Sequence, residues 1–431
     1  MNRAGRFLLL LSICLFTVGA SGQTGAAAAP VTLPASQVAA AQSFDVKAAV
    51  DAYLAKMPPA ERACSDAYFE GGYATLVAVC MSLAQSTQAG STAAPDTGAR
   101  PLVLEKNEGE RRLWRPEPGE VDPGGFILKV TPQSNGSEHL VLLTEDMPPE
   151  AAIPTHKHLE QDEIVLIEKG IIHAHVGDQE RDLHAGGMVF IPAHTWVSLK
   201  NTGTETASIV GIFSAPGFED HLRCESVLAN EKPTIISQAE ENACDRLGHV
   251  VYKDRGEKDP DSGTTPESGA KLLLLEKNEG EQRTFRPEPG EAPSNGLIIP
   301  GGSFIKVSPK NNGSQHLVLM TGSLAPGDAI PTHKHLGQDE ILLIEEGTVR
   351  AHLGDRDRDV HAGGMVFIPA YTWVGVKNTS SEIERGVAIF SAPGFEDHIR
   401  CESVPVSEKP TTMTPAEENE CANVGHVVYK H

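Results

Sequence analysis

The sequence predicts a mainly β protein of two tandem repeats, each a sandwich or small barrel of short strands, preceded by a small α-helical segment. Short apolar or alternating runs of about four to eight residues, separated by Gly, Pro, Asn and Asp, are typical of strands joined by tight turns. A long segment also occurs twice, because His156 in "PTHKHLEQDE" recurs 177 positions later as His333 in "PTHKHLGQDE". Both copies continue to "SAPGFEDH" and end in "GHVVYK".

Residues 1–20 are expected to be a secretory signal peptide. Arg3 and Arg6 are followed by an apolar run, Phe7–Val18, and then by small residues suited to cleavage. No later apolar run approaches the roughly 20 residues of a membrane span. We therefore expect a secreted or periplasmic protein without a membrane span.

Residues 31–86 differ in character from the repeats and predict a small helical module. Apolar side chains there recur at helical spacing before Pro58–Pro59, and Cys64 and Cys80 lie in the same segment. An accessory module that docks to an envelope partner fits this segment better than a catalytic one. The periodic positions are Val46, Ala49, Val50, Tyr53 and Leu54.

Two stretches rich in small and polar residues separate these parts and predict linkers. The resulting order is a signal peptide (1–20), a helical module (31–86), a linker (87–100), a first barrel (101–253), a linker (254–270) and a second barrel (271–431).

Within the first repeat, apolar runs between turn residues predict the strands of the barrel. They are Leu140–Leu143, Ile164–Ile167, Ile171–Val176, Met188–Ile191 and Ser208–Phe213.

The six cysteines beyond the predicted signal peptide favour disulfides in an oxidising compartment. Six cysteines allow fifteen pairings, but the duplication favours closure within each unit. The absence of a CxxC spacing argues against redox or thiolate-ligand roles. The expected pairs are Cys224–Cys244, Cys401–Cys421 and Cys64–Cys80.

The repeated "PTHKH" segment predicts a metal site. Side chains alternate between faces of a strand, so His156 and His158 point the same way. Glu163 follows at the start of the next apolar run, where a turn can bring its carboxylate beside the two imidazoles. Two histidines and one carboxylate form a facial set that leaves coordination positions open. The second copy offers His333, His335 and Glu340; the alternative is a barrel that keeps these residues without metal.

The order of these residues, together with a glycine, proline and asparagine pattern after each triad, resembles the two motifs of the cupin family. The matching residues are Gly186, Pro192 and Asn201, and Gly363, Pro369 and Asn378. The resemblance implies that each repeat is a jelly roll, a double-stranded β-helix, so that the chain is a duplicated-barrel protein, or bicupin.

The second motif departs from the family pattern at two positions in each repeat. Val197 and Val374 stand where the family usually has a fourth ligand, a histidine, and His194 and Tyr371 stand where it usually has glycine. The fourth ligand is therefore left open. The alternatives are His194, Tyr371, His139, His316 or none.

The resemblance implies a metal-dependent enzyme acting on a small organic molecule, with a dioxygenase-like oxidoreductase as the leading interpretation. Glu163 and Glu340 would then relay protons as well as bind a divalent transition metal, two sites per chain, with Fe, Mn, Zn, Ni or Cu all suited to the ligand types. The alternatives are a non-catalytic extracellular protein that binds a sugar or small molecule, and an oxalate-decarboxylase-like enzyme. The formal net charge of −22 makes nucleic acid an unfavourable partner, and the resemblance implies a homo-oligomer.

Overall fold

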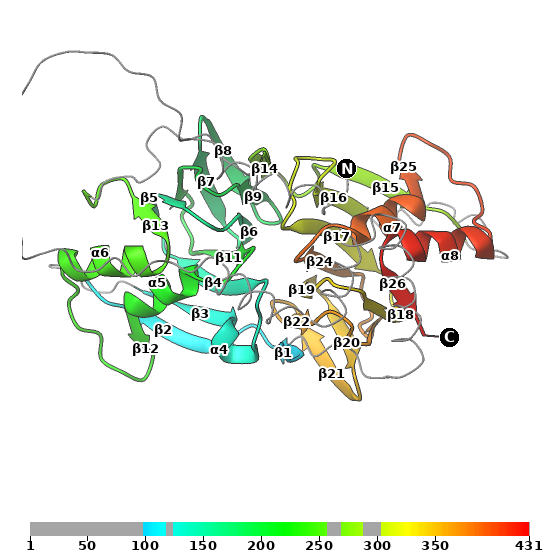
Figure 1. Cartoon of the computed structure of the whole chain (residues 1–431), viewed down its shortest axis with the longest axis horizontal. Coiled ribbons are helices and arrows are strands. Elements are labelled where there is room, and N and C mark those ends of the chain that lie inside the picture. Colours follow the sequence, from blue (N-terminus) through cyan, green and yellow to red (C-terminus); the bar gives the residue numbers. More distant parts are fainter. Residues whose placement is uncertain (1–97, 118–123, 257–268, 288–302, 431) are drawn as a thin grey trace, which may run out of the picture. The chain divides into compact units, whose positions relative to one another are not determined.

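The computed structural model describes residues 98–117, 124–256, 269–287 and 303–430. The predicted signal peptide, the helical module and the Cys64–Cys80 pair lie outside these residues. The described chain is mainly β, and each repeat forms a jelly-roll barrel from one large and one small antiparallel sheet (Figure 1). No helix among the described residues is long and apolar enough to cross a membrane.

The first barrel contains an eight-stranded and a five-stranded sheet. In spatial order the large sheet is β12 (Ser226–Leu228), β2 (Glu110–Trp114), β3 (Gly125–Val130), β4 (Val141–Met147), β11 (Ala207–Phe213), β6 (Glu163–Lys169), β9 (Met188–Ile191) and β14 (Leu273–Leu275). The small sheet is β13 (Val250–Tyr252), β5 (Ala152–His158), β10 (Val197–Asn201), β7 (Ile171–Val176) and β8 (Gln179–His184). All five strands predicted for this repeat are therefore present.

The second barrel repeats this arrangement. Its large sheet is β25 (Ser403–Pro405), β15 (Glu281–Phe285), β16 (Ser303–Val307), β17 (Val318–Leu324), β24 (Glu384–Phe390), β19 (Glu340–Glu346), β22 (Met365–Ile368) and β1 (Leu102–Leu104). Its small sheet is β26 (Val427–Tyr429), β18 (Ala329–His335), β23 (Val374–Asn378), β20 (Thr348–Leu353) and β21 (Arg356–His361).

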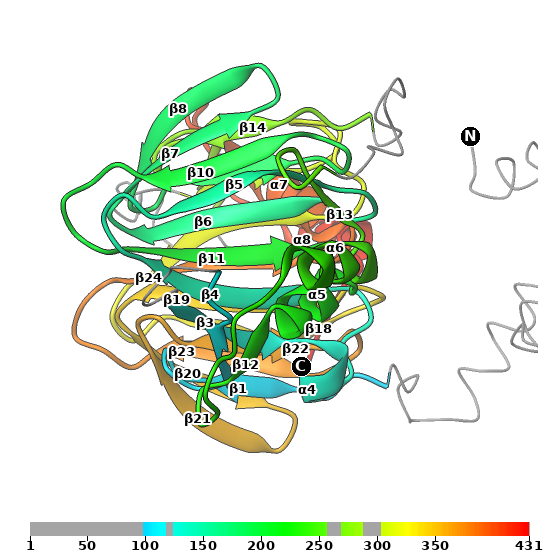
Figure 2. The same cartoon turned by 90° about the vertical axis from the view of Figure 1, so that its left-hand side faces the viewer.

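Short helices accompany each barrel, and a disulfide joins two of them in each repeat. Cys224 bonds to Cys244 and Cys401 bonds to Cys421, which confirms two of the three predicted pairs. The helices are α4 (Pro132–Asn135), α5 (Phe218–Cys224), α6 (Gln238–Leu247), α7 (Phe395–Cys401) and α8 (Pro415–Val424). Each disulfide links the helix after the barrel to the next helix, and Figure 2 shows two of these helices, α5 and α6, beside the first barrel.

The first strand of each repeat lies in the sheet of the other repeat. Leu102–Leu104 pairs with β22 of the second barrel, and Leu273–Leu275 pairs with β9 of the first. Side chains reinforce the exchange, because Arg358 donates to the carbonyl oxygen of Val103 at 2.5 Å and Arg181 donates to that of Leu274 at 3.0 Å. The two barrels are therefore joined by backbone hydrogen bonds.

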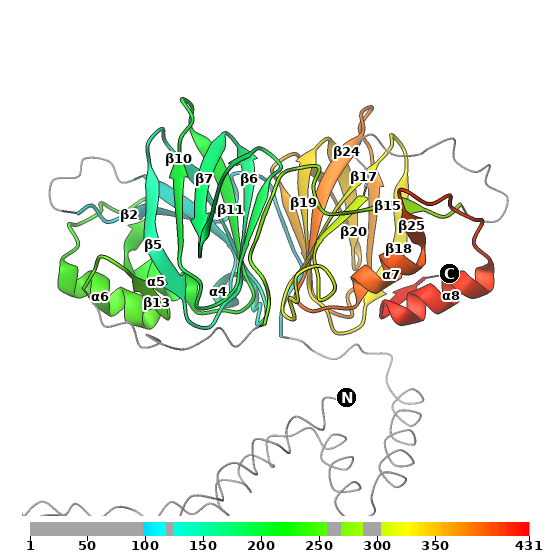
Figure 3. The same cartoon turned by 90° about the horizontal axis from the view of Figure 1, so that it is seen from above.

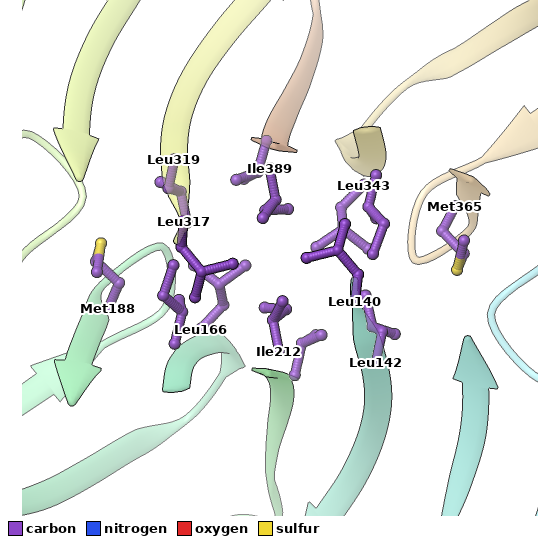
Figure 4. Packing of buried hydrophobic residues seen from close by; sticks show 14 of the residues in the cluster. Leu140, Leu142, Leu166, Met188, Ile212, Leu317, Leu319, Leu343, Met365 and Ile389 are labelled. Carbon is purple, nitrogen blue, oxygen red and sulfur yellow. The ribbon is translucent and has the colours of Figure 1, made fainter. Parts of the chain in front are cut away.

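The two large sheets face each other (Figure 3) and share one apolar core (Figure 4). Alternation along β4 sends Leu140 and Leu142 toward the other barrel and Leu143 into its own barrel. Leu317 and Leu319 of the second repeat pack against Leu140 and Leu142. All four leucines are fully buried. The fold thus places both barrel interiors on either side of a common hydrophobic layer.

Two ion pairs, the crossed His–Asp pairs, bridge the barrels at the edge of this layer. His139 lies 3.0 Å from Asp339, and His316 lies 3.1 Å from Asp162. The aspartates are buried, whereas the histidine side chains are more than half exposed. Hydrogen bonding to the aspartate raises the pKa of both histidines.

Candidate metal centres

In each barrel one strand of the small sheet carries both histidines of the triad. His156 lies opposite Val197 on β10 and Tyr252 on β13, and His158 lies opposite Val250. The two side chains share a face of β5, and their ring centroids are 5.0 Å apart in an edge-to-face arrangement. The ring pair on β18 has the same separation.

The carboxylate reaches the histidines through a short turn between β5 and β6. The backbone N–H of Leu159 donates to the carbonyl oxygen of His249 at 2.9 Å, and the Gln161 side chain donates to that of Pro216 at 3.1 Å. This turn leaves Glu163 at the start of β6, where its Oε2 lies 3.3 Å from Nε2 of His158. One potential ligand atom from each member of the triad lies within 4.8 Å of the others, both in His156, His158 and Glu163 and in His333, His335 and Glu340.

The first histidine of each triad is held neutral, as a metal ligand must be. Burial lowers the pKa of His156 to about 4 and also lowers the pKa of His333. Nδ1 of His156 lies 2.8 Å from the carbonyl oxygen of Pro154, and since that oxygen only accepts, Nδ1 carries the proton. Nε2 therefore has its lone pair available, and the same contact orients His333 against Pro331.

The other histidine of each triad also fits a metal ion. Both ring nitrogens of His158 and of His335 are buried and make no hydrogen bond to any described residue. A buried polar atom without a partner costs about 1–3 kcal/mol, and coordination of a cation would remove that penalty. Two imidazoles and a carboxylate with such free atoms can hold a divalent transition metal.

Each triad borders a cavity in its barrel, of about 580 Å³ in the first repeat and about 320 Å³ in the second. Most of the wall is aliphatic or aromatic. Examples are Leu143, Val165, Leu199 and Phe213 in the first cavity, and Met320, Leu342, Val376 and Phe395 in the second. The cavities can therefore admit an organic molecule to the triads.

None of the three histidines proposed as the fourth ligand joins either triad among the described residues. His139 and His316 form the crossed His–Asp pairs instead. His194 and Tyr371 adopt left-handed φ values of 65° and 67°, which explains why the family pattern has glycine there.

The usual fourth position is instead occupied by a buried aliphatic side chain. Val197 lies directly opposite His156 and Val374 opposite His333, and each is only 1% exposed. Each group thus consists of three protein side chains beside an apolar wall.

A third histidine and a tyrosine lie beside each triad and were not among the predicted site residues. His221 and Tyr252 stack with centroids 5.7 Å apart, and Tyr252 stacks in turn on His156 at 5.3 Å. His398, Tyr429 and His333 form the corresponding group, with Nε2 of His398 2.9 Å from the Tyr429 hydroxyl. The recurrence of "SAPGFEDH" and "GHVVYK" was the signal for these residues, since each string contains one of them.

His221, Glu225 and Asp245 also lie close enough together to suggest a metal site. The guanidinium of Arg255 fills this group, donating to Asp245 at 2.6 Å and to Glu225 at 2.5 Å. The group is therefore a buried ion-pair network.

Fold and site together define a double-barrelled jelly-roll protein with one histidine–carboxylate group in each barrel. The cupin domain model matches residues 143–213 and 320–390, which contain both triads. The chain carries two cupin domains and is a bicupin, as the sequence motifs predicted.

Several solved structures resemble the chain at low sequence identity. Oxalate decarboxylase from Lactobacillus farciminis, in a formate complex, is 15% identical and has a TM-score of 0.43, covering 70% of this chain and 89% of its own. Procruciferin, an 11S globulin from Brassica napus, is 11% identical with a TM-score of 0.44, covering 70% and 87%. Ylba from E. coli is 11% identical with a TM-score of 0.41, covering 72% and 97%. No curated protein matches the chain.

Proposed function

We propose that this bicupin is an extracytoplasmic metalloenzyme that binds one divalent transition metal in each barrel and oxidises a small organic molecule in a dioxygenase-type reaction. The observation that carries the proposal is the position of each triad: one histidine and the glutamate line a mainly apolar cavity, and the other histidine has buried ring nitrogens without a hydrogen bond to a described residue. A metal ion held by such a set supplies Lewis-acid and redox chemistry with coordination positions left open.

The side chains of the barrel have separate roles in this proposal. The apolar wall binds the body of the substrate and excludes water, and Val197 or Val374 keeps a fourth protein ligand away. Glu163 and Glu340 complete the ligand sets and take up a proton from the substrate. Pro154 and Pro331 keep the first histidine of each triad in the tautomer that presents Nε2.

The arginines that line the cavities already bind other protein groups, which favours an apolar substrate over a small dianion such as oxalate. Arg255 is engaged by Glu225 and Asp245. Arg115 donates to Glu240 at 2.8 Å, and Arg283 donates to the carbonyl oxygen of Ser403 at 2.7 Å. Among the described residues lining either cavity, no arginine or lysine is left for a dianion, so the decarboxylase interpretation ranks second.

The disulfides Cys224–Cys244 and Cys401–Cys421 support the extracytoplasmic location, because such bonds persist in oxidising compartments.

Metal analysis of the purified chain tests the proposal. The wild type should carry two first-row metal ions, the variant His156→Ala/His158→Ala one, and the variant with all four triad histidines changed to alanine none. His173→Ala/His175→Ala is the matched control, since these histidines lie on β7 and border neither cavity, and it should retain two.

Oxygen uptake with a panel of phenols then assays the metal-loaded protein, beside carbon dioxide release from oxalate. Oxygen uptake that disappears in the four-histidine variant is the expected result. Carbon dioxide release alone would favour the decarboxylase alternative. A folded wild type that takes up no metal would refute the enzyme and leave the non-catalytic binding protein.

A further inference from the structure

Glutamates that lie apart from the triad also line each cavity, and two of them, Glu145 and Glu384, form no ion pair with a described residue. Glu145 on β4 lines the first cavity together with His156 and Glu163. Glu384 on β24 lines the second cavity together with His333 and Glu340. Neither was among the predicted site residues.

The two glutamates do not correspond to each other in the repeat. The offset of 177 residues that relates the triads places Gly322 at the position of Glu145, and Ala207 at the position of Glu384. Common descent from one ancestral glutamate therefore does not account for this pair of carboxyl groups. Each barrel carries its own on a different strand.

Strand register nevertheless brings both carboxyl groups to the same level, that is, the same position along the strands of the barrel. Glu145 lies opposite Ile209 on β11, and the corresponding pair in the second barrel is Gly322 opposite Gly386. Glu384 leans toward this level, because its Oε1 lies 2.9 Å from the place where a Cβ of Gly386 would stand. The glycine makes room for the carboxyl group.

This level is remote from the triads. Ile209 precedes Phe213 by four residues, and Phe213 lies opposite Glu163. Gly386 likewise precedes Phe390 by four residues, and Phe390 lies opposite Glu340. At about 3.3 Å per residue, each carboxyl group lies about 13 Å along the strand from its triad.

Both carboxyl groups have few protein partners. The indole N–H of Trp114 donates to Glu145 at 3.2 Å, and the backbone of Leu324 hydrogen-bonds to Glu384. No described residue forms an ion pair with either. Burial raises the pKa of both to about 7, so each carboxyl group is costly to ionise. A carboxyl group with a raised pKa thus lines both cavities, supplied by non-equivalent residues. This arrangement indicates that the carboxyl group contacts the bound ligand.

We propose that Glu145 and Glu384 each hydrogen-bond to a hydroxyl group at the end of the bound molecule remote from the triad, so that both barrels accept a hydroxylated, otherwise apolar molecule. This inference rests on the proposed function in one respect, that the cavities bind an organic substrate. It does not depend on the metal or on the reaction.

A matched pair of probes tests the contact in the full-length, metal-free protein. The probes are 4-propylphenol and its methyl ether, which differ in one O–H donor, and calorimetry measures their dissociation constants. The wild type should bind the phenol about fivefold more tightly than the ether, the usual net effect of one hydrogen bond between uncharged groups, donated here by the phenol O–H to a carboxyl oxygen. Glu145→Leu/Glu384→Leu keeps the bulk of both side chains and should bring this ratio close to one.

A transplanted carboxyl group provides the control. In the variant Glu145→Leu/Glu384→Leu, adding Gly322→Glu places a glutamate at the second-barrel equivalent of Glu145, where a Cβ would meet no atom within 4 Å. It should restore the preference for the phenol. An unchanged ratio in a leucine variant with an unchanged unfolding midpoint, or no binding of the phenol by the wild type, would overturn the proposal.

A second measurement needs no variant and remains valid if the leucine variants do not fold. Dicyclohexylcarbodiimide modifies protonated carboxyl groups in apolar surroundings, and peptide mapping locates the adducts. Wild-type protein near neutral pH should be modified at Glu145 and Glu384, and 4-propylphenol should suppress both adducts more strongly than its methyl ether. Absence of the adducts, or equal suppression by both probes, would overturn the proposal. Neither measurement uses metal. A chain that binds the phenol but no metal would therefore refute the proposed metalloenzyme function and leave the proposal for Glu145 and Glu384 standing.

Discussion

Replacing Leu319 by alanine tests whether the two barrels unfold as one unit. Leu319 belongs to the second repeat, is fully buried, and packs in the core shared by both large sheets. The strand exchange through β1 and β14 joins the same two barrels by backbone hydrogen bonds. We therefore expect loss of this side chain to destabilise the first barrel as much as the second.

The size of the shift distinguishes one cooperative unit from two. A buried leucine changed to alanine costs about 3 kcal/mol. The compact unit Ala93–His431 should unfold with an entropy of about 0.7 kcal/mol/K, at about 2.1 cal/mol/K per residue, so its Tm should fall by about 4 °C. If the second barrel unfolded alone, with about half that entropy, its Tm would fall by about 9 °C and that of the first would not change.

Tryptophan fluorescence can report on the first barrel alone. The chain has three tryptophans, and Trp373→Phe leaves only Trp114 and Trp196, both in the first repeat. In this background Leu319→Ala should lower the fluorescence midpoint and the far-UV circular dichroism midpoint by the same amount.

Ile344→Ala provides the control, because Ile344 is buried in the core of the second barrel only. In a single cooperative unit it should also lower the fluorescence midpoint. Two separate transitions, with the fluorescence midpoint unmoved by either substitution, would refute the reasoning.

Three further predictions concern pH, the disulfides and the metal. Hydrogen bonding raises the pKa of His139 and His316 above the ordinary 6.5, so the crossed His–Asp pairs stabilise the fold below about pH 6.5 and lose this effect as the pH rises through the raised values. In urea denaturation, His139→Asn/His316→Asn should therefore lower the free energy of unfolding more at about pH 5.5 than at about pH 8.5, and a loss independent of pH would contradict this account. Cys224→Ser/Cys244→Ser opens a disulfide with a sequence separation of 20 residues and should cost about 3 kcal/mol of unfolding free energy; a variant as stable as the wild type would show that the bond adds nothing. Val197→His places an imidazole opposite His156 in the strand register and should tighten metal binding by at least about tenfold, the lower range for an outer-shell partner. Competition with a chelator measures this, and an unchanged affinity would mean that the position does not reach the metal.

Much of the fold could be predicted because its signals are local. The turn-bounded apolar runs predicted β4, β6, β7, β9 and β11, and the duplication predicted the second barrel and two disulfides. The spacing of His156 and His158 on one strand likewise predicted that their side chains share a face.

The surroundings of the triads could not be predicted from such signals. The crossed His–Asp pairs join residues 200 and 154 positions apart, and either histidine alone resembles a candidate ligand. His221 and His398 reach the triads only through the helices that follow each barrel. Glu145 shows no periodic or motif signal, since its role depends on which strand lies opposite.

The sequence by itself determined the class of the protein, two cupin barrels with a His–His–Glu group in each, because strand alternation and a short turn bring those residues together locally. Only the tertiary structure decided how the barrels are joined and what else surrounds each cavity. The pairing of Leu102–Leu104 with the second barrel, and the level at which Glu145 and Glu384 meet their cavities, depend on strand register between segments far apart in the chain. Register follows from packing of the whole sheet, and no single segment of the sequence specifies it.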